Sequence, residues 1–160
     1  MPDVLTADLY DEHGDSLQVM LPGLRDFGGV RRRVAQVSTV ACFQDNSLVR
    51  DALAEPGEGR VLVVDGGGSQ RFALLGDQLA ARAVANGWAG VVVFGCIRDT
   101  VAIGAMPLLV RALGATPRKT QKRGEGQRDV PVRFLDVTIQ PGAWMALDED
   151  GAVISPGPLG

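Results

Sequence analysis

Two short apolar runs limit the folds open to this chain more than any other feature. Residues 60–65, RVLVVD, and residues 89–95, AGVVVFG, are rich in valine and show no alternation of polar and apolar positions. Strands of this kind are buried on both faces, as in a parallel sheet. Between them lies QLAARAVAN, whose alanines favour a helix, and Gly87 can end that helix. The pattern predicts a βαβ unit, because parallel neighbours need a crossover connection.

The flanking segments extend this unit into an α/β fold. Residues 36–43, QVSTVACF, predict a strand, and residues 45–55, DNSLVRDALAE, predict a helix that Asp45 or Asn46 can cap. Residues 130–156 contain apolar runs broken by LD, QPG and DEDG, which predict β-strands joined by turns. We find no internal repeat and no linker, so we expect residues 1–160 to form a single domain.

Charge and hydropathy argue against several classes of partner. The formal net charge of −3 gives no general attraction to nucleic acid or to an anionic membrane. No apolar run reaches the roughly 18 residues that span a bilayer, and the acidic first residues do not resemble a secretory signal. Cys42 and Cys96 each lie in an apolar run, which favours buried free thiols in a reducing compartment. We therefore expect a cytoplasmic protein.

Most catalytic motifs are missing from the sequence. There is no CxxC, HExxH, GxSxG or Walker lysine loop, and the single histidine, His13, leaves no material for a Ser-His triad elsewhere in the chain. The GGG at 66–68 lacks the GxGxxG spacing of a nucleotide loop, so a tight turn is the better interpretation. A methyltransferase has no support either, because the sequence lacks a glycine-rich loop of the expected spacing.

Charged residues stand at both ends of the apolar stretch that remains. Asp77 opens the predicted helix, and Arg98-Asp99 follow the second buried strand. Ligand sites in α/β sheets gather at the carboxyl ends of strands, so we expect these residues to lie close together in space. By residue type alone Asp77 is a helix cap, and Arg98 can pair with a carboxylate in a loop.

The same residues suit a small keto acid. An arginine fork binds a carboxylate bidentately, and an aspartate suits Mg²⁺, which keeps most of its waters. Metal and arginine together stabilise the charge that develops on a keto oxygen as an enolate forms. Amides after Gly76, at the start of the helix, can hold a carboxylate. The basic segment 117–129, PRKTQKRGEGQRD, is interpreted as a solvated loop, although it could engage an acidic partner.

The chain resembles the family named after the regulator of ribonuclease E activity A, which also contains class II 4-hydroxy-4-methyl-2-oxoglutarate aldolases. The resemblance rests on TADLYDEHGD, on STVACFQDNSLVRDALAEPGEGRVLVVDGGGS, on LLGDQLAARAVANGWAGVVVFGCIRD and on the C-terminal strands. The aldolases carry an Asp, twenty residues and then Arg-Asp, and Asp77 with Arg98-Asp99 keeps that spacing. Ala102 stands where aldolases commonly have an acidic residue.

The resemblance implies a fold, an assembly and a reaction. The fold would be a three-layer β/β/α swivelling-domain sandwich, assembled as a homotrimer with sites between subunits. Asp99 would bind Mg²⁺ or Mn²⁺, and Arg98 would bind substrate and stabilise the enolate. Asp77 would orient metal-bound water in a substrate-holding turn made of Gly76, Asp77, Gln78 and Leu79. The reaction would be cleavage of 4-hydroxy-4-methyl-2-oxoglutarate to two pyruvates, with decarboxylation of oxaloacetate through the same enolate.

A second function is implied by the same resemblance. The family's name points to a protein that binds ribonuclease E and regulates RNA degradation without catalysis. A regulator of that kind would tolerate loss of Asp99, whereas an enzyme would not. The two functions therefore remain open at the level of sequence.

Overall fold

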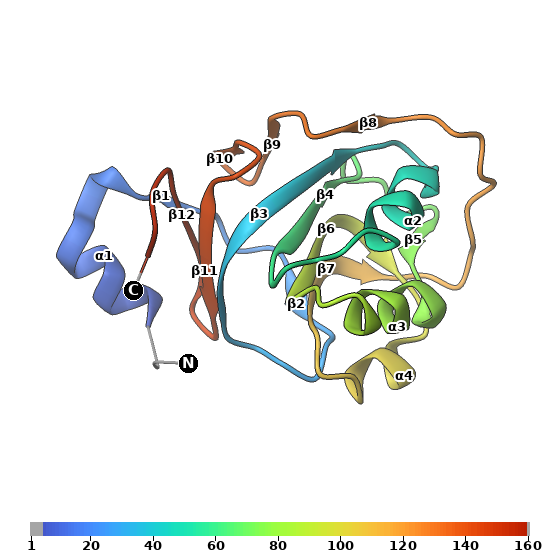
Figure 1. Ribbon diagram of the computed structural model, residues 1–160, viewed down its shortest axis with the longest axis horizontal. Coiled ribbons are helices and arrows are strands. Elements are labelled where there is room, and N and C mark those ends of the chain that lie inside the picture. The colour runs from blue at the N-terminus through green and yellow to red at the C-terminus, as the bar shows by residue number, and fades with distance from the viewer. Residues whose placement is uncertain (1–4, 160) are drawn as a thin grey trace.

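The computed structural model describes residues 5–159, and its centre is a ten-stranded, strongly curled sheet (Figure 1). The strand order is β1-β12-β11-β3-β4-β6-β7-β2, with β5 paired to β6 and β8 paired to β3. The strands are β1 Gln18–Val19, β2 Arg25–Asp26, β3 Arg33–Ala41, β4 Val61–Asp65, β5 Ala73–Leu75, β6 Gly90–Ile97, β7 Leu109–Ala115, β8 Gln127–Arg128, β11 Trp144–Asp148 and β12 Gly151–Ser155. A separate hairpin joins β9 Val132–Phe134 to β10 Val137–Ile139.

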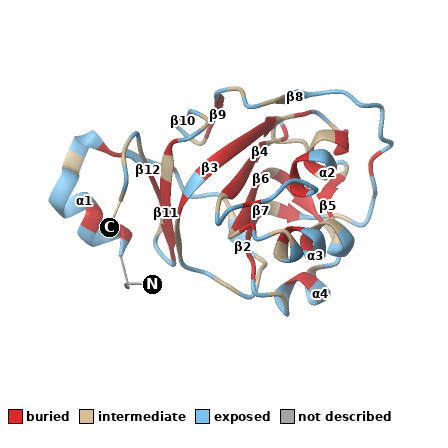
Figure 2. Cartoon of the chain, viewed as in Figure 1, coloured by how far each residue is buried: buried red, intermediate tan, exposed pale blue. Residues whose placement is uncertain are grey.

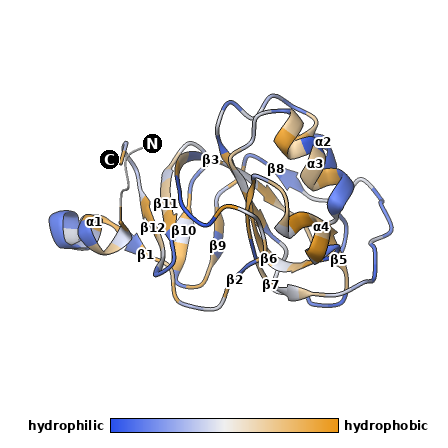
Figure 3. Ribbon diagram, turned by 90° about the horizontal axis from the view of Figure 1, so that it is seen from below, coloured by the Kyte–Doolittle hydropathy of each residue, from blue (hydrophilic) through white to orange (hydrophobic). Residues whose placement is uncertain are grey.

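The helices are short and lie on two sides of the sheet. They are α1 Thr6–His13, the 3-10 turn η1 Gly14–Ser16, α2 Ser47–Leu53, α3 Asp77–Ala85 and α4 Thr100–Gly104. Figure 3 shows α2, α3 and α4 on one side of the strands and the β9–β10 hairpin on the other. These helices, the sheet and the hairpin form the three layers of the predicted α/β fold.

The predicted βαβ unit is confirmed. β4 and β6 pair in parallel, with Val63 opposite Val92, and α3 connects them. All four valine and leucine positions of β4 are buried, which explains why the run shows no alternation.

Strand β3 belongs to two pairings and gives the sheet its curl. Its first half pairs antiparallel with β11, where Ala35 faces Met145, and its second half pairs in parallel with β4, where Val37 faces Val61. One long strand thereby joins the parallel unit to the C-terminal β11–β12 hairpin, as Figure 1 shows.

Each face of the sheet has its own core. Leu62, Val64, Val91 and Val93 point toward the helices, whereas Val61, Val63 and Val92 point toward the C-terminal strands and the β9–β10 hairpin. Figure 2 shows the buried strands between these two layers. The alternate valines fill both cores because successive side chains of a strand point to opposite faces.

Several local expectations are confirmed and others are corrected. Gly67 and Gly68 have φ of 67° and 75°, and the amides of Gly66 and Gly68 both donate to the Phe94 carbonyl, so GGG is a tight turn. Cys42 and Cys96 are free and buried. The strand predicted at 36–43 spans 33–41, and the helix predicted at 45–55 spans 47–53. β5 was not predicted, because three residues show no periodicity.

Within residues 5–159, no helix is both long and apolar enough to cross a membrane.

Candidate active site

Strands β5 and β6 end side by side, and the candidate site lies where they end. They pair in parallel, with Leu75 opposite Ile97. Gly76-Asp77 therefore follow one strand at the point where Arg98-Asp99 follow the other, and the Arg98 amide donates to the Leu75 carbonyl at 2.9 Å. The predicted closeness of these residues is confirmed, although β5 and not β4 supplies the neighbouring edge.

Asp99 is held by its backbone and by the start of α3. It has φ 59° and ψ 45°, the left-handed region that aspartate tolerates better than most residues. Its Oδ2 accepts a hydrogen bond from the Asp77 amide at 3.0 Å. Gly76 is the N-cap residue of α3 and Asp77 is its first helical residue. Among residues 5–159 the Asp77 carboxylate accepts no hydrogen bond from a helix amide, so its predicted capping role is wrong. The carboxylate that caps α3 comes from the β6–α4 turn.

Arg98 stands beside this carboxylate. Its Nε lies 3.7 Å from Asp99 Oδ2, and its Nη1 donates to the Pro117 carbonyl at 3.5 Å. Its side chain keeps 39% of its surface exposed, which leaves room for a ligand. The exposed ion pair contributes little to stability and leaves the guanidinium available for an anionic ligand atom.

Gly76 keeps the two charged groups in place. A Cβ at this position would lie 3.0 Å from Asp99 Oδ2 and 3.3 Å from Arg98 Nε. Its φ is −121°, so backbone freedom does not explain the glycine. The close approach of Arg98 and Asp99 does.

A recess of about 260 Å³ opens beside these residues. The predicted turn, Gly76, Asp77, Gln78 and Leu79, lies along it together with Arg98. Four further cations line the recess: Arg50, Arg82, Lys119 and Lys122. A pocket with five cations and one carboxylate attracts an anionic ligand.

Arg98 also lines a second, open recess of about 410 Å³ with Asp99, Thr100 and Pro117. The arginine thus separates a cationic recess from one that holds the Asp99 carboxylate.

The sequence did not identify Arg50, Arg82, Lys119 or Lys122 as site residues. Arg50 and Arg82 lie on different helices, and the lysines lie in the basic segment interpreted as a solvated loop. The only available signal was the charge of PRKTQKR itself, which carries no information on what the segment faces.

A larger hollow of about 490 Å³ lies far from this site, between α1, β1 and β12. Its described lining residues include Asp11 and Asp150 but no arginine or lysine. Figure 1 shows α1 at the opposite end of the molecule from α3. The geometry therefore favours the sheet edge at Asp99 as the functional site.

Comparison with known proteins identifies the family. Residues 6–154 match the model of the RraA-like family, described as Aldolase/RraA. The chain belongs to the RraA-like family.

Two relatives carry the name "Putative 4-hydroxy-4-methyl-2-oxoglutarate aldolase". The one from Laribacter hongkongensis is 58% identical over 157 residues, covering 98% of this chain and 99% of the relative. The one from Alkalilimnicola ehrlichii is 57% identical over 152 residues, covering 95% and 94%. The RraA-like chain therefore has the length of relatives that carry the aldolase name.

Solved structures give the same fold under other titles. The structure titled as the RNA-processing inhibitor RraA from Thermus thermophilus has a TM-score of 0.95 at 45% identity, covering 99% of this chain and 96% of that one. A Geobacillus kaustophilus structure titled as an S-adenosylmethionine: 2-dimethylmenaquinone methyltransferase has a TM-score of 0.95 at 48% identity, covering 98% and 97%. The predicted fold class is thus confirmed, while the titles of these two structures name two different activities.

Proposed function

We propose that this RraA-like protein is a divalent-metal-dependent lyase that cleaves 4-hydroxy-4-methyl-2-oxoglutarate to two pyruvates and decarboxylates oxaloacetate. The observation that carries the proposal is the meeting of Arg98, Asp99 and the N-terminus of α3, where Arg98 lines both the recess along α3 and the recess that holds Asp99. The aldolase names of the relatives that share its full length support the same reaction.

The donor set fits a hard cation with a water-rich shell. Within residues 5–159, no three or more His, Cys, Asp or Glu side chains group as metal ligands. Asp99 is 37% exposed, and in that part of the chain its second oxygen, Oδ1, accepts no hydrogen bond. Mg²⁺ or Mn²⁺ held by this single carboxylate and by water suits such a site better than zinc does. When bound, the ion supplies Lewis acidity toward a keto oxygen.

The chain's own groups would bind and orient the substrate. In the described chain, the Asp77 amide is bonded to Asp99 and the Ala80 amide to the Gly76 carbonyl, which leaves the amides of Gln78 and Leu79 free. These two amides at the start of α3 would hold the carboxylate next to the keto group. Arg98 would donate to the keto oxygen. Asp77, exposed at the rim, would orient water.

The bond changes follow from this placement. The C4 hydroxyl would give up its proton to the water that Asp77 orients, which would later return a proton to C3, and would become the keto group of one pyruvate as the C3–C4 bond breaks. The electron pair of that bond moves onto C3 and the C2 keto oxygen, where Arg98 stabilises the enolate. Protonation at C3 gives the second pyruvate. In oxaloacetate the same bond breaks with loss of carbon dioxide.

The test is release of pyruvate from 4-hydroxy-4-methyl-2-oxoglutarate and from oxaloacetate, with Mg²⁺, with Mn²⁺ and with EDTA. We expect metal-dependent turnover of both substrates. Turnover of neither above the rate of free metal would refute the lyase.

A second candidate function is regulation of ribonuclease E by direct binding. The observation in its favour is the 45% identity to a protein titled an RNA-processing inhibitor. Binding of purified ribonuclease E that survives loss of Asp99, without any turnover, would establish this function in place of the lyase.

We also propose a homotrimer with the site between subunits. Val101, two residues after Asp99, is 91% exposed, and a neighbouring subunit would cover such an apolar side chain. Light scattering after size-exclusion chromatography tests this: a monomer would contradict it.

A further inference from the structure

We infer that residues 117–126, here called the strap, form a subsite for a second carboxylate, in which Lys119 and Lys122 bind the far end of a dicarboxylic 2-keto acid. This inference rests on the proposed function, because the keto-acid end of the ligand would lie at Arg98 and α3. The basic segment, interpreted from the sequence as a solvated loop, would then form one side of the binding site.

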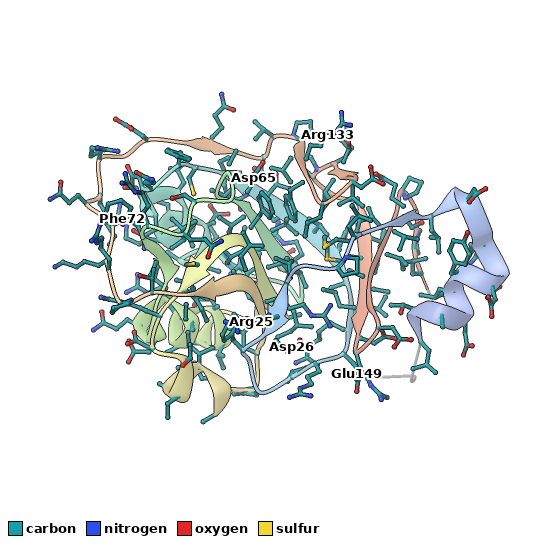
Figure 4. All side chains as sticks on the ribbon, turned by 180° about the vertical axis from the view of Figure 1, so that it is seen from behind. Arg25, Asp26, Asp65, Phe72, Arg133 and Glu149 are labelled. Carbon is teal, nitrogen blue, oxygen red and sulfur yellow. The ribbon has the colours of Figure 1, made fainter. Side chains whose placement is uncertain are left out.

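The strap is attached to the strand that leads into the site. The Ala73 amide donates to the Arg118 carbonyl at 2.7 Å, and Lys119 forms a parallel bridge with Ala73 in β5. The Arg118 guanidinium stands 5.6 Å from the ring centroid of Phe72, which Figure 4 labels beside this segment. Because β5 ends one residue before Gly76, this anchor sets Lys119 at the rim of the recess.

A buried polar network holds the other half of the strap. Asp45 is fully buried, and its Oδ2 accepts the amides of Arg123 at 2.8 Å and Glu125 at 3.1 Å. Its Oδ1 accepts the amide and the hydroxyl of Ser47 at the start of α2. An ionised carboxylate is costly to bury unless hydrogen bonds compensate the lost water. The hydrogen bonds from Arg123 and Glu125 compensate Asp45, and they also hold the backbone of this largely exposed segment in place.

Thr120 fixes the point between the two lysines. Its hydroxyl donates to Asn46 Oδ1 at 2.6 Å, and the Asn46 amide side chain donates to the Leu74 carbonyl at 3.2 Å. Thr120 and Asn46 are both buried, whereas Lys119 and Lys122 are exposed. The lysines therefore start from a rigid backbone, and less side-chain and loop entropy is lost when they bind a ligand.

The charges of the strap lysines are not balanced by the protein. Between residues 5 and 159, no carboxylate forms an ion pair with Lys119, Lys122 or Arg82, although all three line the recess. In the same part of the chain, Arg50 pairs only with the exposed Asp51. An anion opposite Arg98 would meet these cations, and a ligand with one carboxylate would leave them without a partner.

The test compares two ligands that differ in the second carboxylate. 2-Oxoglutarate has the five-carbon backbone and both carboxylates of the proposed substrate, whereas pyruvate ends at the keto-acid group. We would measure their dissociation constants by calorimetry with Mg²⁺ present, for the wild-type protein and for the double variant Lys119→Gln/Lys122→Gln. The matched control is Arg123→Gln, which removes a strap charge outside the recess.

We expect the double variant to weaken binding of 2-oxoglutarate at least about tenfold and to change that of pyruvate less than about twofold, because hydrogen bonds to charged groups are lost only at the far end. Arg123→Gln should change neither. Equal weakening of both ligands, no weakening, or failure of the wild-type protein to bind 2-oxoglutarate more tightly than pyruvate would overturn the subsite. Since binding is read without turnover, loss of the lyase and loss of the subsite are separate results.

Discussion

The Oδ2 atom of Asp99 accepts the backbone amide of Asp77 at 3.0 Å, across a gap of 22 residues in the chain. One carboxylate thus does two things: it caps α3 and presents its other oxygen at the candidate site. Asp148 likewise caps α1, but with both of its oxygens, since Oδ2 accepts the Thr6 amide and Oδ1 the Thr6 hydroxyl, both at 2.7 Å. In both cases a carboxylate at the end of a strand, or two residues beyond it, supplies the cap that the helix lacks.

The substitution Asp99→Asn separates these two roles. Asparagine tolerates the left-handed backbone and keeps an oxygen for the Asp77 amide, so we expect the midpoint of thermal unfolding to change little. It loses the negative charge that a divalent cation needs. Pyruvate release should fall about 10²-fold or more, as when a group that stabilises transition-state charge is removed.

The variant Asp99→Ala serves as the comparison. It should lose turnover and also about 1 kcal/mol of unfolding free energy, because the cap of α3 is lost. Full turnover in Asp99→Asn would show that the charge of Asp99 has no part in the reaction.

The substitution Gly76→Ala should damage the site without disturbing the backbone. The new Cβ would press on Asp99 Oδ2 at 3.0 Å and on Arg98 Nε at 3.3 Å. A displacement of catalytic groups by about 1 Å can cost about 10²-fold in rate, and we expect a loss of that order in pyruvate release.

Gly157→Ala is the matched control, since a Cβ there meets no atom within 4 Å. It should keep wild-type turnover. Unchanged activity in Gly76→Ala would show that Arg98 and Asp99 have room to move apart without loss of function.

Asp45 should make the protein less stable in acid. Burial raises the pKa of this carboxyl, but hydrogen bonds from the Ser47 hydroxyl and from the amides of Ser47, Glu125 and Arg123 outweigh it and lower the pKa from 3.8 to about 2. A group whose pKa is lower in the folded state contributes stability above its unfolded pKa, and this stability is lost as the pH falls from about 4 toward 2.

Urea unfolding of the wild type and of Asp45→Asn at pH 7, 4 and 3 measures this contribution. The variant should be less stable at pH 7, and the difference from wild type should shrink as the pH falls. A difference that does not depend on pH would mean that Asp45 does not titrate in this range.

The two thiols should be unreactive in the folded protein. Burial, with the charges of Asp45 and Asp65, raises the pKa of Cys42 from 9.0 to about 12, and burial also raises the pKa of Cys96. Since the thiolate is the reactive form, a disulfide reagent at pH 8 should label neither cysteine until the protein is unfolded. Rapid labelling of either thiol in the folded state would contradict the packing around it.

The sequence by itself determined the parallel core and the closeness of the candidate site residues. The valine runs of β4 and β6 are apolar at nearly every position, which predicts strands buried on both faces. The alanines of α3 favour a helix, so the local pattern was enough to predict a βαβ unit. Ligand sites lie at the carboxyl ends of such strands, and this located Asp77 beside Arg98 and Asp99.

Only the tertiary structure decided how that site is built. β5 is only three residues long and is a strand because it pairs with β6. Three residues are too few to show a hydrophobic period, so the sequence does not predict this strand. The same holds for the strap, whose position depends on Asp45, 78 residues before Arg123 in the chain. Composition described that segment as polar and basic. Hydrogen bonds between residues far apart in the chain place Lys119 and Lys122 at the recess beside Arg98. Such contacts cannot be predicted from the local sequence.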